Sequence, residues 1–296
     1  MKTLVLFDVS NFIFRAYHSN PKDLTNANGE PTNAIYGVAF MFLAILKDFS
    51  KTRDVFPVCC FDGPHSRKTR TDVDETYKQN RLAIDDALKV QFKGVKTLVD
   101  AMNLPKIEIA SKEADDVIAS LVHQQKENFE EIIICSPDKD LCQCVINDNI
   151  KIYDPKKKVI ITKTEIEEKY KVSMNHFKQY QALIGDKADN VKGVKGIGPK
   201  YATTIINECN GNIEEYVKTQ TKYARIIQNE KENYTNSLKM VTLETDLKVD
   251  LEFIQYFPDA VKDNTTLKEY FQKQGFQSLL KRYYQVEQFG FIDETI

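Results

Sequence analysis

The sequence lacks the features expected of a membrane or secreted protein. No apolar run in its 296 residues approaches the roughly 20 needed to cross a bilayer. The chain begins directly with a strand-like segment, 3–7, without a basic region or a small-residue cleavage site. None of its six cysteines forms a C-x-x-C pair, so neither a zinc site nor a disulfide framework is indicated. We therefore predict a cytoplasmic protein with reduced cysteines.

The sequence also lacks a strong charge excess and any acidic cluster that contains histidine. Its formal net charge is −2, which at first sight argues against a nucleic-acid partner. That inference fails if a group of carboxylates is reserved for metal ions. None of the four histidines lies in an acidic cluster, so a histidine-based general base is not indicated. The content of 42% apolar and 28% charged residues is typical of a globular protein.

Short apolar segments alternate with amphipathic ones in the first half of the chain. Strands are predicted at 3–8, 55–61, 107–110, 131–136 and 151–154, and helices at 34–49 and 86–103. Strand–helix–strand alternation predicts an α/β fold with a parallel sheet and helices on both faces. We expect a polar turn at Ser10–Asn11 and an exposed excursion over 65–86.

The character of the sequence changes near residue 163, where short helices and glycine-rich, basic turns begin. We therefore predict two domains, 1–162 and 163–296. In the second, Pro199 suits a first helical turn, and the glycines before it permit a tight hairpin (191–200). A helix start of this kind is a phosphate-binding site, and Lys192, Lys195 and Lys200 add positive charge.

Acidic residues recur where the predicted strands end. They are Asp8, Asp62, Glu113, Asp115, Asp116, Asp138 and Asp140. Three of them share the run Glu113-Ala114-Asp115-Asp116 at a helix start, where the helix dipole offsets repulsion by only about 0.3–1 kcal/mol per group. Ligands bind at this edge of open α/β sheets, so a divalent-metal site is the simplest explanation. Asp186 and Asp189 are expected to complete it. Any one of these residues taken alone is equally well explained as a turn or cap.

Such a site suits phosphodiester hydrolysis. The reaction develops charge on the attacking and leaving oxygens, and a metal pair about 3.5–4 Å apart stabilises both. Mg²⁺ prefers oxygen ligands, so carboxylates without histidine are the expected ligand set.

The chain resembles the 5′-nuclease domain of bacterial DNA polymerase I and the phage flap endonucleases. The resemblance runs from Leu4 to about Tyr283. The matching stretches are 14–18, 31–38, Tyr77-Lys78 with Arg81, 113–118, 138–141 and 185–198. Because the sequence stops where the polymerase of such proteins begins, we expect a free-standing nuclease.

The resemblance implies a PIN-like sheet domain with a helical clamp (63–92) and a helix–hairpin–helix DNA-binding region. It implies two Mg²⁺ ions, replaceable by Mn²⁺, on the nine carboxylates named above. Lys78 and Arg81 would act on the scissile phosphate, with Arg70 assisting, and Tyr77 would stack on a base. The hairpin would hold duplex DNA through Lys192, Gly193, Lys195, Gly196, Gly198 and Lys200, with a K⁺ ion on the carbonyls of Val191, Val194 and Ile197.

The implied activity is that of a 5′–3′ exonuclease and flap endonuclease, acting as a monomer on branched or RNA-primed DNA in replication and repair. A DNA polymerase recruited in trans is the expected protein partner, and no membrane is involved. The main alternative is a structure-specific DNA-binding protein with weak or no cleavage. A PIN-type ribonuclease toxin would lack the hairpin, and an aspartate-based phosphatase would explain neither hairpin nor clamp.

Overall fold

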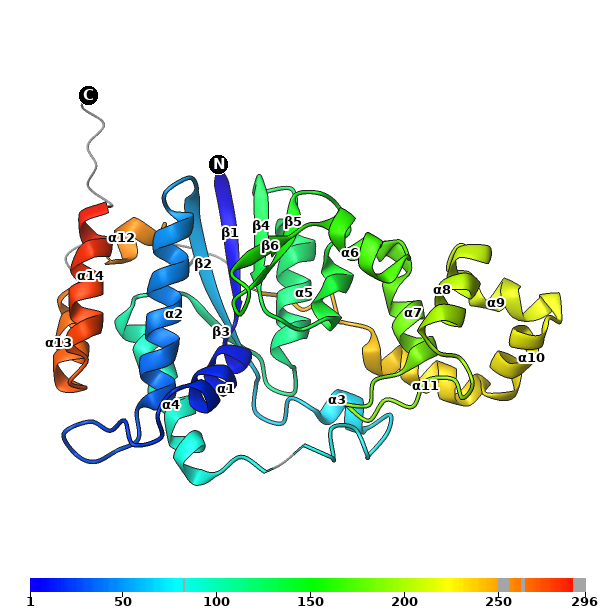
Figure 1. The fold of residues 1–296 in the computed structure, drawn as a ribbon, viewed down its shortest axis with the longest axis horizontal. Coiled ribbons are helices and arrows are strands. Elements are labelled where there is room, and N and C mark those ends of the chain that lie inside the picture. Colours follow the sequence, from blue (N-terminus) through cyan, green and yellow to red (C-terminus); the bar gives the residue numbers. More distant parts are fainter. Residues whose placement is uncertain (82, 250–255, 262–263, 290–296) are drawn as a thin grey trace.

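The computed structural model describes residues 1–81, 83–249, 256–261 and 264–289 (Figure 1). The predicted clamp and second domain therefore each include positions outside the described residues. Among the residues described, no helix combines the length and apolar character needed to span a membrane.

A six-stranded sheet forms the centre of the molecule, in the order β3-β2-β1-β4-β5-β6. Its strands are β1 (Lys2–Asp8), β2 (Asp54–Phe61), β3 (Lys106–Glu108), β4 (Glu131–Cys135), β5 (Ile150–Asp154) and β6 (Val159–Ile161). The first five pair in parallel, whereas β6 runs antiparallel to β5. The predicted α/β fold with a parallel sheet is confirmed. Strand β6 was not predicted, because it is three residues long and follows a run of lysines.

Helices connect the strands and make up the rest of the chain. The α-helices are α1 (Val9–Ser19), α2 (Asn33–Phe49), α3 (Lys68–Thr71), α4 (Asp86–Ala101), α5 (Ala114–Gln125), α6 (Lys163–Tyr170), α7 (Phe177–Ile184), α8 (Pro199–Glu208), α9 (Ile213–Tyr216), α10 (Lys222–Asn229), α11 (Lys231–Val241), α12 (Phe257–Val261), α13 (Thr265–Lys273) and α14 (Gln277–Phe289). The 3₁₀ helices are η1 (Asp140–Cys144), η2 (Met174–His176) and η3 (Val217–Thr219).

The polar turn expected at Ser10–Asn11 is wrong. Helix α1 begins at Val9, directly after β1, with Asp8 as its N-cap. The Asp8 carboxylate accepts the backbone N–H of Asn11, so an aspartate predicted as a metal ligand also starts a helix. Polar residues in the first turn concealed this helix from the sequence pattern.

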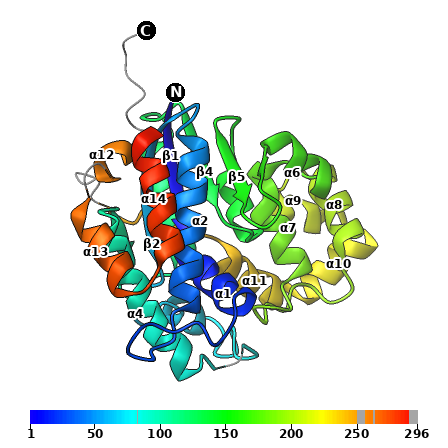
Figure 2. The same ribbon diagram turned by 60° about the vertical axis from the view of Figure 1, so that its left-hand side comes forward.

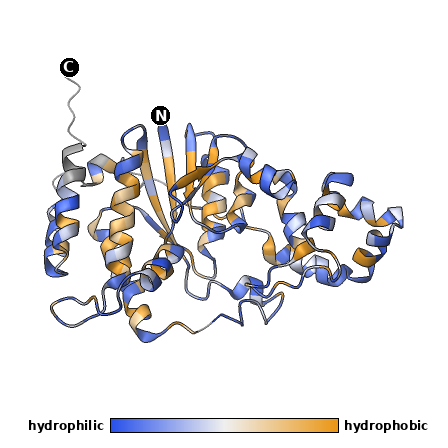
Figure 3. Cartoon of the chain, viewed as in Figure 1, coloured by the Kyte–Doolittle hydropathy of each residue, from blue (hydrophilic) through white to orange (hydrophobic). Residues whose placement is uncertain are grey.

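Side chains alternate between the two faces of the sheet, as the period of a strand requires. On β1, Val5 and Phe7 face α1, α2 and α4, whereas Leu4 and Leu6 face α5. Figure 3 shows apolar residues gathered on the sheet and on the helices beside it. Phe7, Phe12 and Phe42 form an aromatic cluster on the first face, with ring centroids 4.3–5.6 Å apart.

Helices from the second half of the chain extend both hydrophobic layers. Ile205 of α8 and Ile227 of α10 belong to the same cluster as Leu4 and Leu6. Helices α13 and α14 return to the other face, where α14 lies beside α2, at the opposite end of the molecule from α8–α10 (Figures 1 and 2). The chain from 163 onward is therefore in contact with both faces of the sheet domain.

The core assignment predicts the effect of truncating Phe7, which is fully buried. Phe7→Ala should lower the free energy of unfolding by about 3–5 kcal/mol, because it leaves a cavity between β1 and α2. Urea unfolding followed by circular dichroism measures this change. The matched control is Val90→Ala on α4, 55% exposed, which should stay within about 0.5 kcal/mol of the parent. Equal effects of the two substitutions would contradict the assignment.

Candidate metal centre and nucleic-acid interface

The acidic residues converge because the parallel strands end at one edge of the sheet. Strands β1 and β4 are neighbours, and their connections leave to opposite sides, with β2 and β3 on one side and β5 and β6 on the other. This arrangement is a topological switch point, where open α/β sheets bind ligands. Asp8 ends β1, and Asp138 follows β4 at this point.

Four aspartates form the first group, which we call the switch-point carboxylates. They are Asp8, Asp62, Asp115 and Asp138. Ser136 Oγ donates to Asp8 Oδ2 at 2.8 Å, and Ser10 Oγ donates to Asp62 Oδ2 at 2.6 Å. The backbone N–H of Ala114 donates to the other oxygen of Asp62 at 2.9 Å, which ties the end of β2 to the start of α5.

The negative charges of these carboxylates repel one another, and a bound cation would relieve that repulsion. Burial raises the pKa of Asp8 to about 6, with further contributions from the charges of Asp62 and Asp138, against hydrogen bonds from Asn11 and Ser136. Burial and the charges of Asp138 and Asp8 raise the pKa of Asp115 well above its usual range. The atoms that this group offers to a metal ion are all carboxylate oxygens, which fits a hard divalent cation.

A second group, the Asp140 triad, joins the two halves of the chain. Asp140 of η1 lies next to Asp186 and Asp189 from the loop after α7, with one oxygen of each within 4.8 Å of the others. Burial raises the pKa of Asp140 to about 7, with a further contribution from Asp138. Burial also favours a higher pKa for Asp186. Hydrogen bonds from Lys139 and from two backbone N–H groups outweigh this effect, so the pKa of Asp186 is lowered.

Glu113 and Asp116 are held by cations from the clamp. Arg70 donates to Glu113 at 2.7 Å and to both oxygens of Asp116 at 2.8 and 2.9 Å. Glu113 Oε1 accepts a hydrogen bond from Lys78 Nζ. Glu113 Oε2, which Arg70 contacts, also accepts one from Tyr77 Oη at 3.1 Å. Asp116 is 1% exposed, and its Oδ1 also accepts a hydrogen bond from the backbone N–H of Glu244, so both of its oxygens already have partners.

Most described residues of the excursion expected over 65–86 are exposed, but three of its side chains are buried against the site. Arg70, Tyr77 and Lys78 are each 5–6% exposed. Lys78 has a left-handed backbone (φ 53°), and its N–H donates to the carbonyl of Asp189 at 3.0 Å. Arg81 Nη2 reaches Asp189 Oδ1 at 2.5 Å. Three cations of the segment, Arg70, Lys78 and Arg81, form ion pairs with carboxylates distant in sequence, which no local pattern reveals.

The hairpin lies between α7 and α8, where it was expected. Asp186 and Val191 exchange backbone hydrogen bonds of 2.8 and 2.7 Å at its base. Gly185 requires its glycine: φ is 69°, and a Cβ would lie 2.4 Å from the carbonyl oxygen of Val191. Lys195, Gly196, Gly198 and Lys200 are exposed, whereas Val194 and Ile197 are buried. Lys192 pairs with Asp74 at 3.1 Å.

Three residues expected to contact DNA, Tyr77, Arg70 and Gly193, are already engaged in contacts within the protein. The ring of Tyr77 packs with Ala182, Val191, Met240 and Val241, so it is not free to stack on a base. Arg70 is committed to Glu113, Asp116 and the carbonyl of Met240. The N–H of Gly193 donates to buried Ser237.

The carbonyls of Val191 and Val194 each accept one backbone hydrogen bond, which leaves a lone pair on each oxygen for the expected K⁺ ion.

Several supporting residues were missed by the sequence analysis. Ser10 and Ser136 orient the switch-point carboxylates, and Gln181 donates to Asp140 Oδ1 at 2.6 Å. Ser136 stands two residues before Asp138, a spacing that could have identified it. Gln181 lies inside an ordinary helical pattern, so nothing in the local sequence distinguishes it.

A carboxylate-rich sheet edge beside a hairpin between two helices defines a class of metal-dependent nucleases acting on DNA. Family comparison agrees: residues 3–171 match the 5′-3′ exonuclease N-terminal resolvase-like domain, and residues 172–263 match the 5′-3′ exonuclease C-terminal SAM fold. The chain belongs to the 5′-3′ exonuclease family. The resemblance stated from sequence, with its nuclease activity, is confirmed.

Individual relatives support this assignment. The chain is 36% identical to a 5′-3′ exonuclease of Aquifex aeolicus, over 95% of both chains. It is 32% identical to DNA polymerase I of Caldicellulosiruptor bescii, covering 98% of this chain but 35% of the polymerase. The fold matches T5 5′-exonuclease with bound zinc (TM-score 0.66, 21% identity, 95% of this chain and 100% of that one). It also matches the T5 flap endonuclease in a complex with DNA and metal ions (TM-score 0.63, 20% identity, 96% and 100%).

The raised pKa values predict how stability depends on pH without divalent ions. Asp8 and Asp140 have folded pKa values of about 6 and 7, above the ordinary 3.8, so the native state binds more protons than the unfolded state between these values. In chelator, the melting temperature should therefore fall as pH rises from 5 to 8. Added Mg²⁺ should raise it more at pH 8 than at pH 5, because the ligands must be deprotonated.

Differential scanning calorimetry in EDTA and in MgCl₂ measures both effects. Asp140→Asn is the matched control, since it removes one of the raised carboxyl groups and should flatten the pH dependence in chelator. A melting temperature in chelator that rises between pH 5 and 8 would contradict the predicted repulsion.

Proposed function

We propose that this family member hydrolyses phosphodiester bonds at 5′ ends and 5′ flaps of DNA, using two Mg²⁺ ions held by its carboxylates. The observation that carries the proposal is the convergence of acidic side chains from β1, β2, β4, α5 and the 186–189 loop beside the ammonium group of Lys78. Mn²⁺ would substitute for Mg²⁺, since it accepts the same oxygen ligands.

The switch-point carboxylates with Glu113 would hold one ion, and the Asp140 triad the other. Bound divalent cations supply charge stabilisation to the attacking and leaving oxygens and lower the pKa of water. Glu113 stands between the two groups, bound by Arg70, Tyr77 and Lys78. Asp116, proposed from sequence as a ligand, would instead act by fixing Arg70 and, through it, the orientation of Glu113.

Lys78 and Arg81 would bind the scissile phosphate. Lys78 Nζ contacts Glu113 and lies 3.6 Å from Asp189 Oδ2, so it faces both proposed metal groups. Burial opposes its charge, but these two carboxylates keep its pKa raised, so it stays protonated. A buried, permanently charged donor between the carboxylates is suited to neutralise charge that develops on a phosphate.

The hairpin would hold the duplex arm by its backbone. Lys195 and Lys200 are exposed beside Gly196 and Gly198, and phosphate contacts of this kind position DNA without reading its sequence. A K⁺ ion on the carbonyls of Val191, Val194 and Ile197 would add a fixed positive charge. We further propose a cytoplasmic monomer that acts on flapped and RNA-primed DNA, with a DNA polymerase as a partner in trans.

Asp138→Asn tests the metal-dependent chemistry. It keeps the side-chain volume and the acceptor for the Asp140 N–H (2.9 Å) but removes one charge. Cleavage of a 5′-flap substrate in Mg²⁺ should fall by about 10²–10³-fold or more. DNA affinity measured in Ca²⁺ by fluorescence anisotropy should remain within a few-fold. Asp148→Asn, an exposed aspartate before β5, is the matched control and should retain full activity. Full cleavage by Asp138→Asn would exclude Asp138 from the metal-dependent chemistry, whereas a parent protein that binds the flap in Mg²⁺ without cutting it would favour a DNA-binding protein over a nuclease.

Lys78→Met tests the role of the buried ammonium group. The turnover number on a flap substrate should fall by roughly 100-fold, because a positioned charge is lost. Glu113 and Asp189 would also lose a cation, so the protein in chelator should melt at a lower temperature and gain more from Mg²⁺ than the parent. Lys187→Met, at an exposed lysine in the neighbouring loop, should change neither quantity. Unchanged turnover in Lys78→Met would exclude Lys78 from the reaction.

A further inference from the structure

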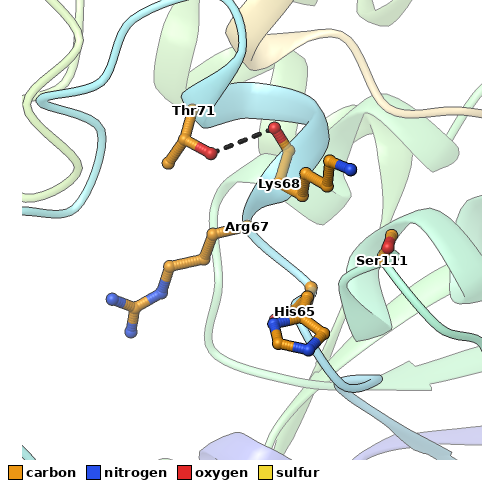
Figure 4. A pocket seen from close by; sticks show the side chains of 6 residues that line it. His65, Arg67, Lys68, Thr71 and Ser111 are labelled. Atoms are coloured by element: carbon orange, nitrogen blue, oxygen red, sulfur yellow. Dashed lines mark hydrogen bonds between the residues drawn. The ribbon is translucent and has the colours of Figure 1, made fainter.

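A pocket of about 610 Å³ lies beside the proposed metal centre and is not used by the function described above. Its lining residues are His65, Ser66, Arg67, Lys68, Thr71 and Ser111. Figure 4 shows that His65, Arg67 and Lys68 extend from the segment after β2, while Ser111 approaches from the loop after β3. The segment follows Asp62, and Ser111 precedes Glu113, so both walls of the pocket continue into proposed metal ligands.

The two walls are fixed to each other by backbone contacts. The N–H of Gly63 donates to the carbonyl of Lys112 at 3.0 Å, and the N–H of Ser111 donates to that of Pro64 at 2.8 Å. A Cβ on Gly63 would lie 1.8 Å from the carbonyl oxygen of Ile109, so only glycine permits this approach. Thr69 Oγ1 donates to the carbonyl of Ser111 at 3.3 Å. The pocket is thus built into the junction of two strand ends.

The charge of the pocket is uncompensated. His65, Arg67 and Lys68 are exposed, and none of the six lining side chains is acidic. Among the described residues, the ion pairs include neither Arg67 nor Lys68. The neighbouring cations Arg70, Lys78 and Arg81 are by contrast all paired with carboxylates. Two cations, with hydroxyl groups around them, are therefore available to an anion from solution.

We propose that this pocket binds an internal phosphodiester of the DNA strand, close to the bond that is cut. The inference rests on the proposed function and extends its DNA contacts beyond the hairpin and the clamp lysine. The proposed metal ligands that follow both walls of the pocket repel any anion, so free phosphate has no other contact to offset this repulsion. A phosphate within a strand is kept in place by the other contacts of that strand.

The test uses the double variant Arg67→Gln/Lys68→Gln in the full chain. Binding of a 5′-flap DNA in Ca²⁺ is measured by fluorescence anisotropy at several KCl concentrations. We expect roughly 10-fold weaker binding at 100 mM salt and a slope of log K against log salt reduced in magnitude by about 1–2, because two phosphate contacts are lost. The matched control is Lys51→Gln/Lys126→Gln, at the opposite edge of the sheet, which should leave both quantities unchanged.

A second measurement identifies the source of the phosphate. Single methylphosphonate linkages are placed along the strand near the cleavage site, one position at a time. At the contacted position the neutral linkage should weaken binding to the parent but not to the double variant. Coupling at no position would overturn the proposal in favour of a small-anion site. An unchanged salt slope would overturn it outright.

These outcomes separate the inference from the proposed function. If the parent cuts the flap and the double variant binds it with parent-like affinity, the pocket proposal fails and the nuclease assignment stands. If the parent neither binds nor cuts the flap in Mg²⁺, the proposed function itself fails. Circular dichroism of the variant establishes that it is folded before either comparison is made.

Discussion

Repulsion between carboxylates at one edge of the sheet is the constraint on which the rest of the structure depends. Asp8, Asp115 and Asp140 are so placed that burial and neighbouring negative charges raise their pKa values. A fold gains nothing from this arrangement by itself, because each buried charge must be compensated. The structure tolerates it through hydrogen bonds from Ser10, Ser136 and Gln181, and through cations brought from elsewhere in the chain.

The clamp supplies those cations, which explains its conformation better than its local sequence does. Arg70, Lys78 and Arg81 lie in a largely exposed segment with few aliphatic residues, yet each of the three meets a carboxylate of the site. Only one short helix, α3, forms between residues 63 and 81. Ion pairs with distant carboxylates, rather than helix propensity, therefore determine where this segment lies. Order in the clamp and charge balance in the metal centre are two consequences of the same contacts.

The difference between local sequence patterns and contacts with distant residues also explains what the sequence could predict. Strands β1, β2, β4 and β5, helices α2 and α4, and the meeting of Asp8 with Asp138 follow from hydrophobic pattern and from the rule that parallel strands end at one edge. Helix α1 and strand β6 were missed, because polar residues or short length obscure their pattern. The burial of Tyr77 and Lys78 could not be predicted, since it depends on Glu113 and Asp189, 36 and 112 positions from Tyr77 along the chain. Local patterns identify which residues have a chemical role, but not which partner each one has in the folded chain.

The loop from 185 to 193 shows how closely the two halves of the site are connected. Its first part supplies Asp186 and Asp189 to the Asp140 triad, and its second part begins the hairpin. The backbone bonds between Asp186 and Val191, and the close approach of Gly185 to Gly193, connect these two parts directly. Lys78 is attached to the same loop through the carbonyl and the carboxylate of Asp189. The position of the hairpin is therefore linked to the positions of Asp186, Asp189 and Lys78, and through these to the metal centre.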